Sequence, residues 1–279
     1  MKKLIGATAI SLQLLTPTAF AADQSEQENH FRELYGIEVQ NESVSSYYAD
    51  AEGLKGRQLF DALHEITGRN YRSFSYGEAR DILYNKADNQ NGKVYAHYSD
   101  LWVTGRGRDW KEQGDANRDG TGNDFINCEH IWPQSKFGKS LPMVSDIHHL
   151  FSTFSKPNGM RSHYAFGEVN RSLYSTSAGS KLGEGEIFEP ADTAKGNVAR
   201  AMLYFYTRYH NRNIWAQNTS KDEFFFDNLE TFMRWHAADP VDEKEKHRNE
   251  VIYQNQRNRN PFIDRPEFVT QIGIDGFAR

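Results

Sequence analysis

A single cysteine, Cys128, limits how this chain of 279 residues can fold. No disulfide can form within one copy, so the folded state depends on burial of apolar side chains and on any bound cations. Apolar residues make up 38% of the chain and aromatic residues 13%, more than disordered chains carry. We therefore expect a globular protein with a large core, in which Cys128 is a small buried hydrophobe.

The N-terminus has the pattern of a secretory signal. A basic start at Met1–Lys3 precedes a mostly apolar run at Leu4–Leu15 and the A-x-A motif Ala19-Phe20-Ala21. The apolar run is too short to span a bilayer, and the alternative is a buried N-terminal helix. We predict an extracellular or periplasmic protein with these segments: signal peptide 1–21, polar arm or linker 22–46, and one domain over 47–279.

Hydrophobic spacing and capping residues predict more helices than strands. Ser75 with Glu78, and Ser220 with Glu223, are capping-box patterns that begin two of the helices. The expected helices are Leu54–Thr67, Tyr76–Leu83, Asn197–Tyr209, Ser220–Met233 and Asp242–Gln254, the last polar and rich in charge. The expected strands are Val94–Val103, Phe125–Trp132 and Ile147–Phe151. Strands clustered in the middle of a mostly helical chain predict an α+β fold with a small sheet.

The residues that point to chemistry lie between 127 and 162. The chain has no Walker loop, G-x-S-x-G elbow, HExxH motif or paired CxxC. Instead Glu129 and His130 end one expected strand, and Asn158 lies at the start of an expected helix with Ser155 as N-cap. A strand–strand–helix unit would bring Glu129 and Asn158 together as oxygen ligands of a hydrated Mg²⁺ ion, with His130 facing the same space as a neutral base.

Five motifs together resemble the endonuclease I family of secreted nonspecific nucleases, in its cysteine-poor branch. They are Glu129–Ser135, Asp146–Leu150, Asn158–Arg161, Lys195–Ala201 and Asn258–Pro266. The resemblance implies a ββα-metal (His-Me finger) core, with a small antiparallel sheet and surrounding helices. It also implies a Mg²⁺-dependent, sugar-nonspecific endonuclease that hydrolyses DNA and also RNA to 5′-phosphate and 3′-hydroxyl ends.

The same resemblance implies a role for each matching residue. His130 resembles the general base, and its ordinary pKa near 6.5 leaves a neutral fraction at pH 7. Glu129 and Asn158 resemble the ligands of a single Mg²⁺, for which Mn²⁺ can substitute. Arg161 would clamp a phosphate oxygen of the substrate, or would instead be a structural ion-pair partner.

The net charge of −5 is unusual for a protein that binds nucleic acid. A local cluster of arginines would resolve this, and we expect several of them to line one cleft near His130. Arg200, Arg257 and Arg259 are the candidate phosphate-binding residues. The others considered for this cleft are Arg106, Arg108, Arg161 and Arg265.

Two further metal sites have to be considered. Asp115, Asn117 and Asp119 resemble half of a calcium loop, but Ile126 stands where an EF-hand has its glutamate. They indicate either a looser structural Ca²⁺ site or an Asx-rich surface turn. His148 and His149 suggest zinc, but adjacent residues of a strand point to opposite faces, so we expect one to be packed inside and the other near the cleft.

The residues alone leave two other functions open. One is a metal-dependent phosphodiesterase that acts on small nucleotides, and the other is a non-catalytic, calcium-stabilised secreted binding module. The sequence does not indicate an oligomeric state.

Overall fold

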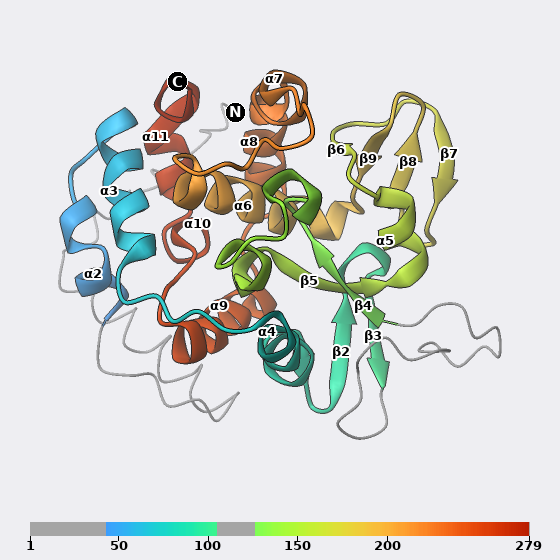
Figure 1. Cartoon of the computed structure of the whole chain (residues 1–279), viewed down its shortest axis with the longest axis horizontal. Coiled ribbons are helices and arrows are strands. Elements are labelled where there is room, and N and C mark those ends of the chain that lie inside the picture. Colours follow the sequence, from blue (N-terminus) through green and yellow to red (C-terminus); the bar gives the residue numbers. More distant parts are fainter. Residues whose placement is uncertain (1–42, 105–125, 279) are drawn as a thin grey trace, which may run out of the picture. The chain divides into compact units, whose positions relative to one another are not determined.

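Helix α6, Asp192–Tyr209, lies at the centre of the helical part of the molecule (Figure 1). The computed structural model describes residues 43–104 and 126–278. Nearly every residue of α6 is buried, because α3, α8 and α10 all pack against it. The predicted signal peptide, most of the predicted arm, Arg106, Arg108 and the proposed calcium residues Asp115, Asn117 and Asp119 lie outside the described residues.

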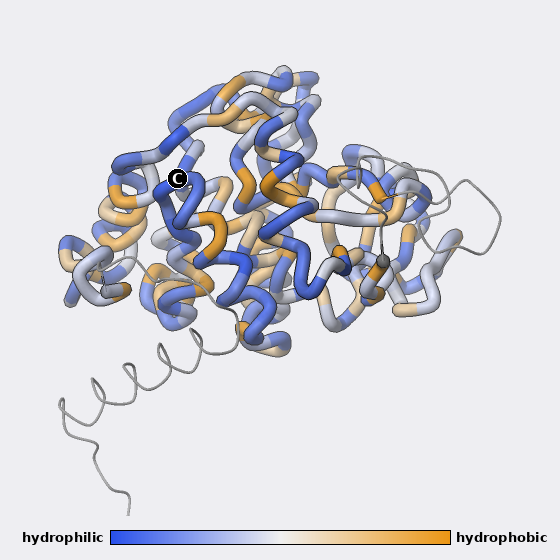
Figure 2. The backbone as a smooth tube through the Cα atoms, turned by 90° about the horizontal axis from the view of Figure 1, so that it is seen from below, coloured by the Kyte–Doolittle hydropathy of each residue, from blue (hydrophilic) through white to orange (hydrophobic). Residues whose placement is uncertain are grey.

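The helices of the described part confirm the α+β class together with three small sheets. Their bounds are α2 Val44–Tyr47, α3 Gly56–Gly68, α4 Tyr76–Ile82, α5 Ser155–Arg161, α6 Asp192–Tyr209, α7 Lys221–Phe224, α8 Leu229–Ala238, α9 Glu243–Gln256, α10 Pro261–Asp264 and α11 Glu267–Phe277. Figure 2 shows hydrophilic and hydrophobic stretches next to one another along the backbone, as expected for elements with one face on a core.

Each sheet is built from short strands. The sheets are β1 Asn89–Gln90 with β2 Lys93–Ala96 and β3 Leu101–Thr104; β4 Ile126–His130 with β5 Leu150–Phe154; and β6 Ala165–Phe166 with β7 Ser172–Ser175, β8 Lys181–Gly183 and β9 Ile187–Glu189. The first two sheets are antiparallel throughout, whereas β6 pairs with β9 in parallel. No helix of the described part is long and apolar enough to cross a membrane.

Local sequence signals predict many of these elements, but they give none of the strands β6–β9 and they misplace several boundaries. The capping box of Ser75 and Glu78 is present in full at α4. Ser220 caps α7, but that helix ends at Phe224 and α8 starts only at Leu229, so the expected continuous helix is wrong. A 3₁₀ turn at His97–Ser99 divides the expected strand into β2 and β3. Helix α5 starts directly after Phe154, so Ser155 is its first residue and not its N-cap.

Helix α9 has the polar composition that the sequence predicts, yet it is largely buried. Three of its buried charged side chains pair with residues outside the helix: Glu245 with Arg200, Arg248 with Asp88, and Glu250 with Arg259. Buried charges are tolerated only when they are paired and hydrogen-bonded. The helix therefore lies inside the protein because these charges find partners. Asp88 and Arg200 are far from it in the sequence, whereas Arg259 follows its last residue by three positions.

Candidate active site

Strands β4 and β5 and helix α5 form a compact ββα unit. The two strands pair in register, with His130 opposite Leu150 and Glu129 opposite Phe151. The chain between them passes through the 3₁₀ helix Ile147–His149, and β5 leads directly into α5. The unit matches the ββα core that the family resemblance implies.

Helix α5 lies against one face of β4. Asn127 and Glu129 are two residues apart, so their side chains share a face of the strand. Asn158 and Arg161 are three residues apart, so they share a face of the helix. Asn158 Nδ2 donates to Asn127 Oδ1 at 2.6 Å, and Arg161 Nη1 lies 2.9 Å from Glu129 Oε1. These two contacts bring Asn158 and Glu129 to the same side of the unit.

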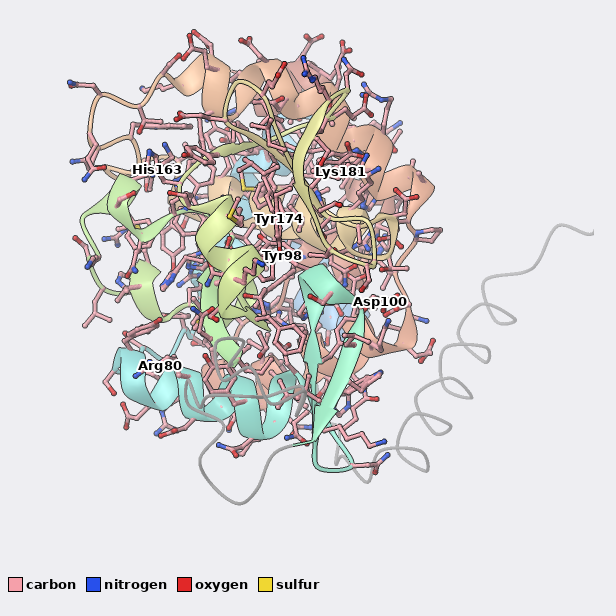
Figure 3. The ribbon with its side chains drawn as sticks, turned by 90° about the vertical axis from the view of Figure 1, so that its right-hand side faces the viewer. Arg80, Tyr98, Asp100, His163, Tyr174 and Lys181 are labelled. Atoms are coloured by element: carbon pink, nitrogen blue, oxygen red, sulfur yellow. The ribbon has the colours of Figure 1, made fainter. Side chains whose placement is uncertain are left out.

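The Glu129 carboxylate is buried and held by two donors. The Tyr98 hydroxyl and Arg161 Nη1 both approach Oε1, each at 2.9 Å. Tyr98 lies on the 3₁₀ helix His97–Ser99, which packs against α5, and Figure 3 shows Tyr98 close to α5. Burial raises the pKa of the Glu129 carboxyl to about 7, although Arg161 and Tyr98 act in the opposite direction. A cation beside Glu129 would therefore stabilise its ionised form.

The His130 ring is only 4% exposed. It packs against Tyr76 and His149, with ring centres 5.3 and 5.5 Å away. Its Nε2 lies 3.1 Å from the carbonyl oxygen of Val144. Because a carbonyl can only accept, Nε2 carries the hydrogen and Nδ1 is the basic nitrogen of the neutral ring.

Burial, together with the neighbouring His149, lowers the pKa of His130 to about 3. This differs from the value near 6.5 expected from the sequence. The ring is accordingly neutral over the whole physiological pH range. A bound phosphodiester anion would raise this pKa, because a negative charge nearby favours the protonated ring.

Arg161 is fully buried, and the structure corrects its expected role as a phosphate clamp. Nη1 donates to the carbonyl of His130 at 2.9 Å, and Nη2 donates to that of Ile131 at 2.6 Å. The guanidinium also lies 4.4 Å from the centre of the Phe166 ring. With no exposed surface it cannot touch substrate, so the alternative of a structural ion-pair partner describes it.

The expected cleft of arginines near His130 is wrong for Arg200 and Arg259. Arg200 and Arg259 are buried, the first paired with Glu245 and the second with Glu250 and Asp264. Arg265 pairs with Glu52 and Glu267. Acidic partners brought by the fold hold these guanidinium groups, so Arg200 and Arg259 are not available to phosphate. Arg257 is partly buried at the C-terminal end of α9, in a left-handed conformation with φ of 67°.

Among the described residues, His148 and His149 are not part of a cluster of metal ligands. They lie in a 3₁₀ helix and not in a strand, and both are buried, so neither faces a cleft. His148 Nε2 is 3.0 Å from the carbonyl of Asn258, and His149 Nε2 is 2.7 Å from that of Met143. Within 43–104 and 126–278, no group of three or more His, Cys, Asp or Glu residues is arranged to hold a metal ion.

The donors present nevertheless fit a hydrated magnesium ion. Asn158 uses its Nδ2 toward Asn127 and the carbonyl of Cys128, which leaves Oδ1 as the acceptor. The Tyr98 hydroxyl and the Arg161 guanidinium both approach Glu129 through Oε1 and not through Oε2. One carboxylate and one amide oxygen are hard ligands, and Mg²⁺ is commonly held by one or two protein groups while it keeps several waters.

Two residues of this site were not predicted from the sequence. Asn127 could have been found from the alternation of the strand, since it lies two positions before Glu129. Tyr98 is 31 positions from Glu129 in the chain, and no local pattern connects the two.

Comparison with known proteins identifies the family. The family model described as Endonuclease I matches residues 53–267. The chain belongs to the endonuclease I family. It is therefore an endonuclease, a hydrolase of phosphodiester bonds, which excludes the non-catalytic alternative. The match spans the ββα unit, α6 and α9.

Several relatives are named for nuclease activity outside the cytoplasm. The chain is 31% identical over 241 residues to an extracellular ribonuclease of Bacillus amyloliquefaciens, covering 82% of this chain and 78% of the relative. It is 30% identical to the extracellular ribonuclease of Bacillus subtilis (strain 168), with the same coverage. It is also 27% identical to a periplasmic deoxyribonuclease of Aeromonas hydrophila, over 50% of this chain and 63% of that protein.

Proposed function

We propose that the chain is a secreted, Mg²⁺-dependent, sugar-nonspecific endonuclease that cleaves DNA and RNA to 5′-phosphate and 3′-hydroxyl ends. The observation that carries this proposal is the double contact between β4 and α5, which brings the oxygen ligands Glu129 and Asn158 to one side of the unit that ends in His130. Relatives named as ribonucleases and as deoxyribonucleases support both substrates, and their extracellular or periplasmic names support a signal at 1–21.

His130 is the general base in this proposal. The Val144 carbonyl fixes the tautomer, so Nδ1 accepts the proton of the attacking water. Glu129 and Asn158 would hold Mg²⁺, with Mn²⁺ as a substitute, and the ion supplies positive charge where negative charge develops on the phosphate. Tyr98 and Arg161 orient the Glu129 carboxylate and touch no substrate.

Removal of divalent cations is expected to abolish cleavage. Plasmid DNA incubated with Mg²⁺ should be nicked, EDTA should stop the reaction, and Mn²⁺ should restore it. The Glu129→Gln variant should need a higher Mg²⁺ concentration, because an amide is a weaker ligand than a carboxylate. Glu184→Gln, at an exposed carboxylate paired with Arg171, is the matched control and should behave as wild type. Nicking that persists in EDTA would contradict the metal role.

The Tyr98→Phe variant is expected to weaken Mg²⁺ binding about 10-fold, in the range seen for groups that orient a metal ligand. The change removes only the hydroxyl that donates to Glu129. Calorimetric titration with Mg²⁺ measures the affinity directly, and cleavage at saturating Mg²⁺ should be nearly unchanged. Tyr95→Phe is the control, since that hydroxyl bonds Asp100 instead. Equal affinity in Tyr98→Phe and wild type would rule out an orienting role.

A further inference from the structure

A cavity of about 490 Å³ lies where α3 and α6 end. This volume lies within the range of small-molecule sites and is large enough for a nucleotide. Part of its wall comes from the residues that end or follow these two helices, and part from the loop before the 3₁₀ helix Ile147–His149. The lining residues used below are His64, Glu65, Arg69, Tyr71, Pro142, Arg208 and Arg212.

The cavity brings three cationic side chains together, although the chain is acidic overall. Arg69, Arg208 and Arg212 line it together with one carboxylate, Glu65. Arg69 also forms an exposed pair with Asp50, which is the kind of contact that contributes little to stability. Arg212 is exposed and forms no ion pair with a described residue.

Arg208 is the buried member of this group. It is 7% exposed, and its guanidinium lies 4.1 Å from the centre of the Tyr71 ring. Nε is 3.2 Å from Asp146 Oδ2, whereas Nη1 has no hydrogen-bond partner among the described residues. A buried guanidinium with an unused donor is costly unless a ligand satisfies it.

Arginines at the C-terminal ends of helices often cap free carbonyls, but other donors serve these carbonyls here. His64 Nδ1 bonds the carbonyl of Thr207. The backbone amides of Arg69 and Arg212 bond those of Ile66 and Tyr209. The guanidinium groups are therefore not needed as caps, and the donors that Arg69 and Arg208 do not use toward Asp50 and Asp146 remain for an anion.

The cavity lies near the ββα unit that carries His130. Pro142 is two residues from Val144, so the Cα atoms of Pro142 and Val144 lie within about 7 Å of each other. The carbonyl of Val144 in turn accepts a hydrogen bond from His130. Tyr71 is five residues from Tyr76, which packs on the His130 ring, so those Cα atoms lie within about 18 Å. Each strand of a nucleic-acid duplex carries one phosphate per about 3.4 Å of axis, so a few nucleotides cover this separation.

We propose that this cavity is a phosphate-binding subsite, which holds a backbone phosphate of the nucleic-acid substrate a few nucleotides from the bond that is cleaved. The inference rests on the proposed function for the identity of the ligand. Planar guanidinium groups match phosphate oxygens in pairs, and Tyr71 and His64 offer rings beside them. The subsite also explains how an acidic protein holds a polyanion, since the attraction is local.

The test compares the Arg69→Ala/Arg212→Ala double variant with Arg171→Ala/Arg234→Ala. The control also removes two exposed arginines, which pair with Glu184 and Glu168 on another part of the surface. Binding of a short fluorescent single-stranded DNA is measured in EDTA at several salt concentrations. The subsite variant should bind the DNA about 10-fold more weakly. The slope of log K against log salt should also be shallower, by about 0.7 for each phosphate that the variant no longer neutralises. The control should match wild type.

Inorganic phosphate should compete with the DNA in wild type and much less in the subsite variant. Unchanged affinity and salt slope in the subsite variant would overturn the inference, as would an equally weakened control. Weaker binding without competition by phosphate would also overturn it. Cleavage by His130→Gln tests the proposed function separately. If His130→Gln is inactive but the salt slope of the subsite variant is unchanged, only the subsite is refuted. If the salt slope of the subsite variant is reduced but His130→Gln is active, only the proposed mechanism is refuted.

Discussion

Replacement of His130 by Gln is expected to lower the rate of phosphodiester cleavage by about 10²–10⁴-fold, the usual contribution of a general base. Glutamine can still donate a hydrogen bond toward the Val144 carbonyl, but it has no basic nitrogen in place of Nδ1. Single-turnover cleavage of a labelled oligonucleotide at saturating Mg²⁺ measures the decrease. Mg²⁺ affinity should stay near that of wild type, because His130 is not one of the proposed ligands.

The choice of variant follows from the burial of the ring. His130→Ala would also remove packing against Tyr76 and His149, so its reduced activity must be read beside its thermal stability. His163, exposed just after α5, provides the control, and His163→Gln should retain full activity. A folded His130→Gln protein with wild-type cleavage would refute the assignment of the base.

Replacement of Arg161 by Met is expected to destabilise the protein by about 3–5 kcal/mol, because it leaves the buried Glu129 carboxylate without its charged partner. It also removes the hydrogen bonds to the carbonyls of His130 and Ile131. Chemical denaturation, with the slope compared between variants, measures the free energy of unfolding. Arg171→Met, at an exposed pair with Glu184, should change it by less than about 1 kcal/mol.

A double-mutant cycle separates the charge from the packing. Glu129→Gln removes the buried charge and keeps an acceptor for the Tyr98 hydroxyl. The Arg161→Met/Glu129→Gln double variant should therefore be more stable than Arg161→Met alone, which shows coupling between the two sites. If the free energies simply add, or if Arg161→Met is as stable as wild type, the structural role of Arg161 is wrong.

Much of the catalytic unit can be predicted from the sequence because its signals are local. Glu129, His130 and Asn158 lie within about thirty positions of one another, the first two on β4 and the third on α5. Strand alternation and helix spacing then indicate which side chains share a face. The capping box at Ser75 is local in the same sense, and it is formed in the structure.

The arginines show where such reasoning fails. Arg200 and Arg259 look like free cations in the sequence, yet α9 places Glu245 and Glu250 against them. The pKa of His130 is lower than its ordinary value for a similar reason. Tyr76 and His149, which bury the His130 ring, come from segments on either side of His130 in the chain. Desolvation and charge pairing depend on distance in space and not on position in the chain.

The residue types and their spacing alone thus determined the α+β class, the ββα unit and the candidate ligands, because backbone periodicity and metal preference are local properties. Only the tertiary structure decided that Arg161 supports the site from inside, that Tyr98 holds Glu129, and that Arg69, Arg208 and Arg212 line one cavity. Those outcomes depend on which buried charges find partners when distant segments pack together, and burial makes an unpaired charge too costly to keep.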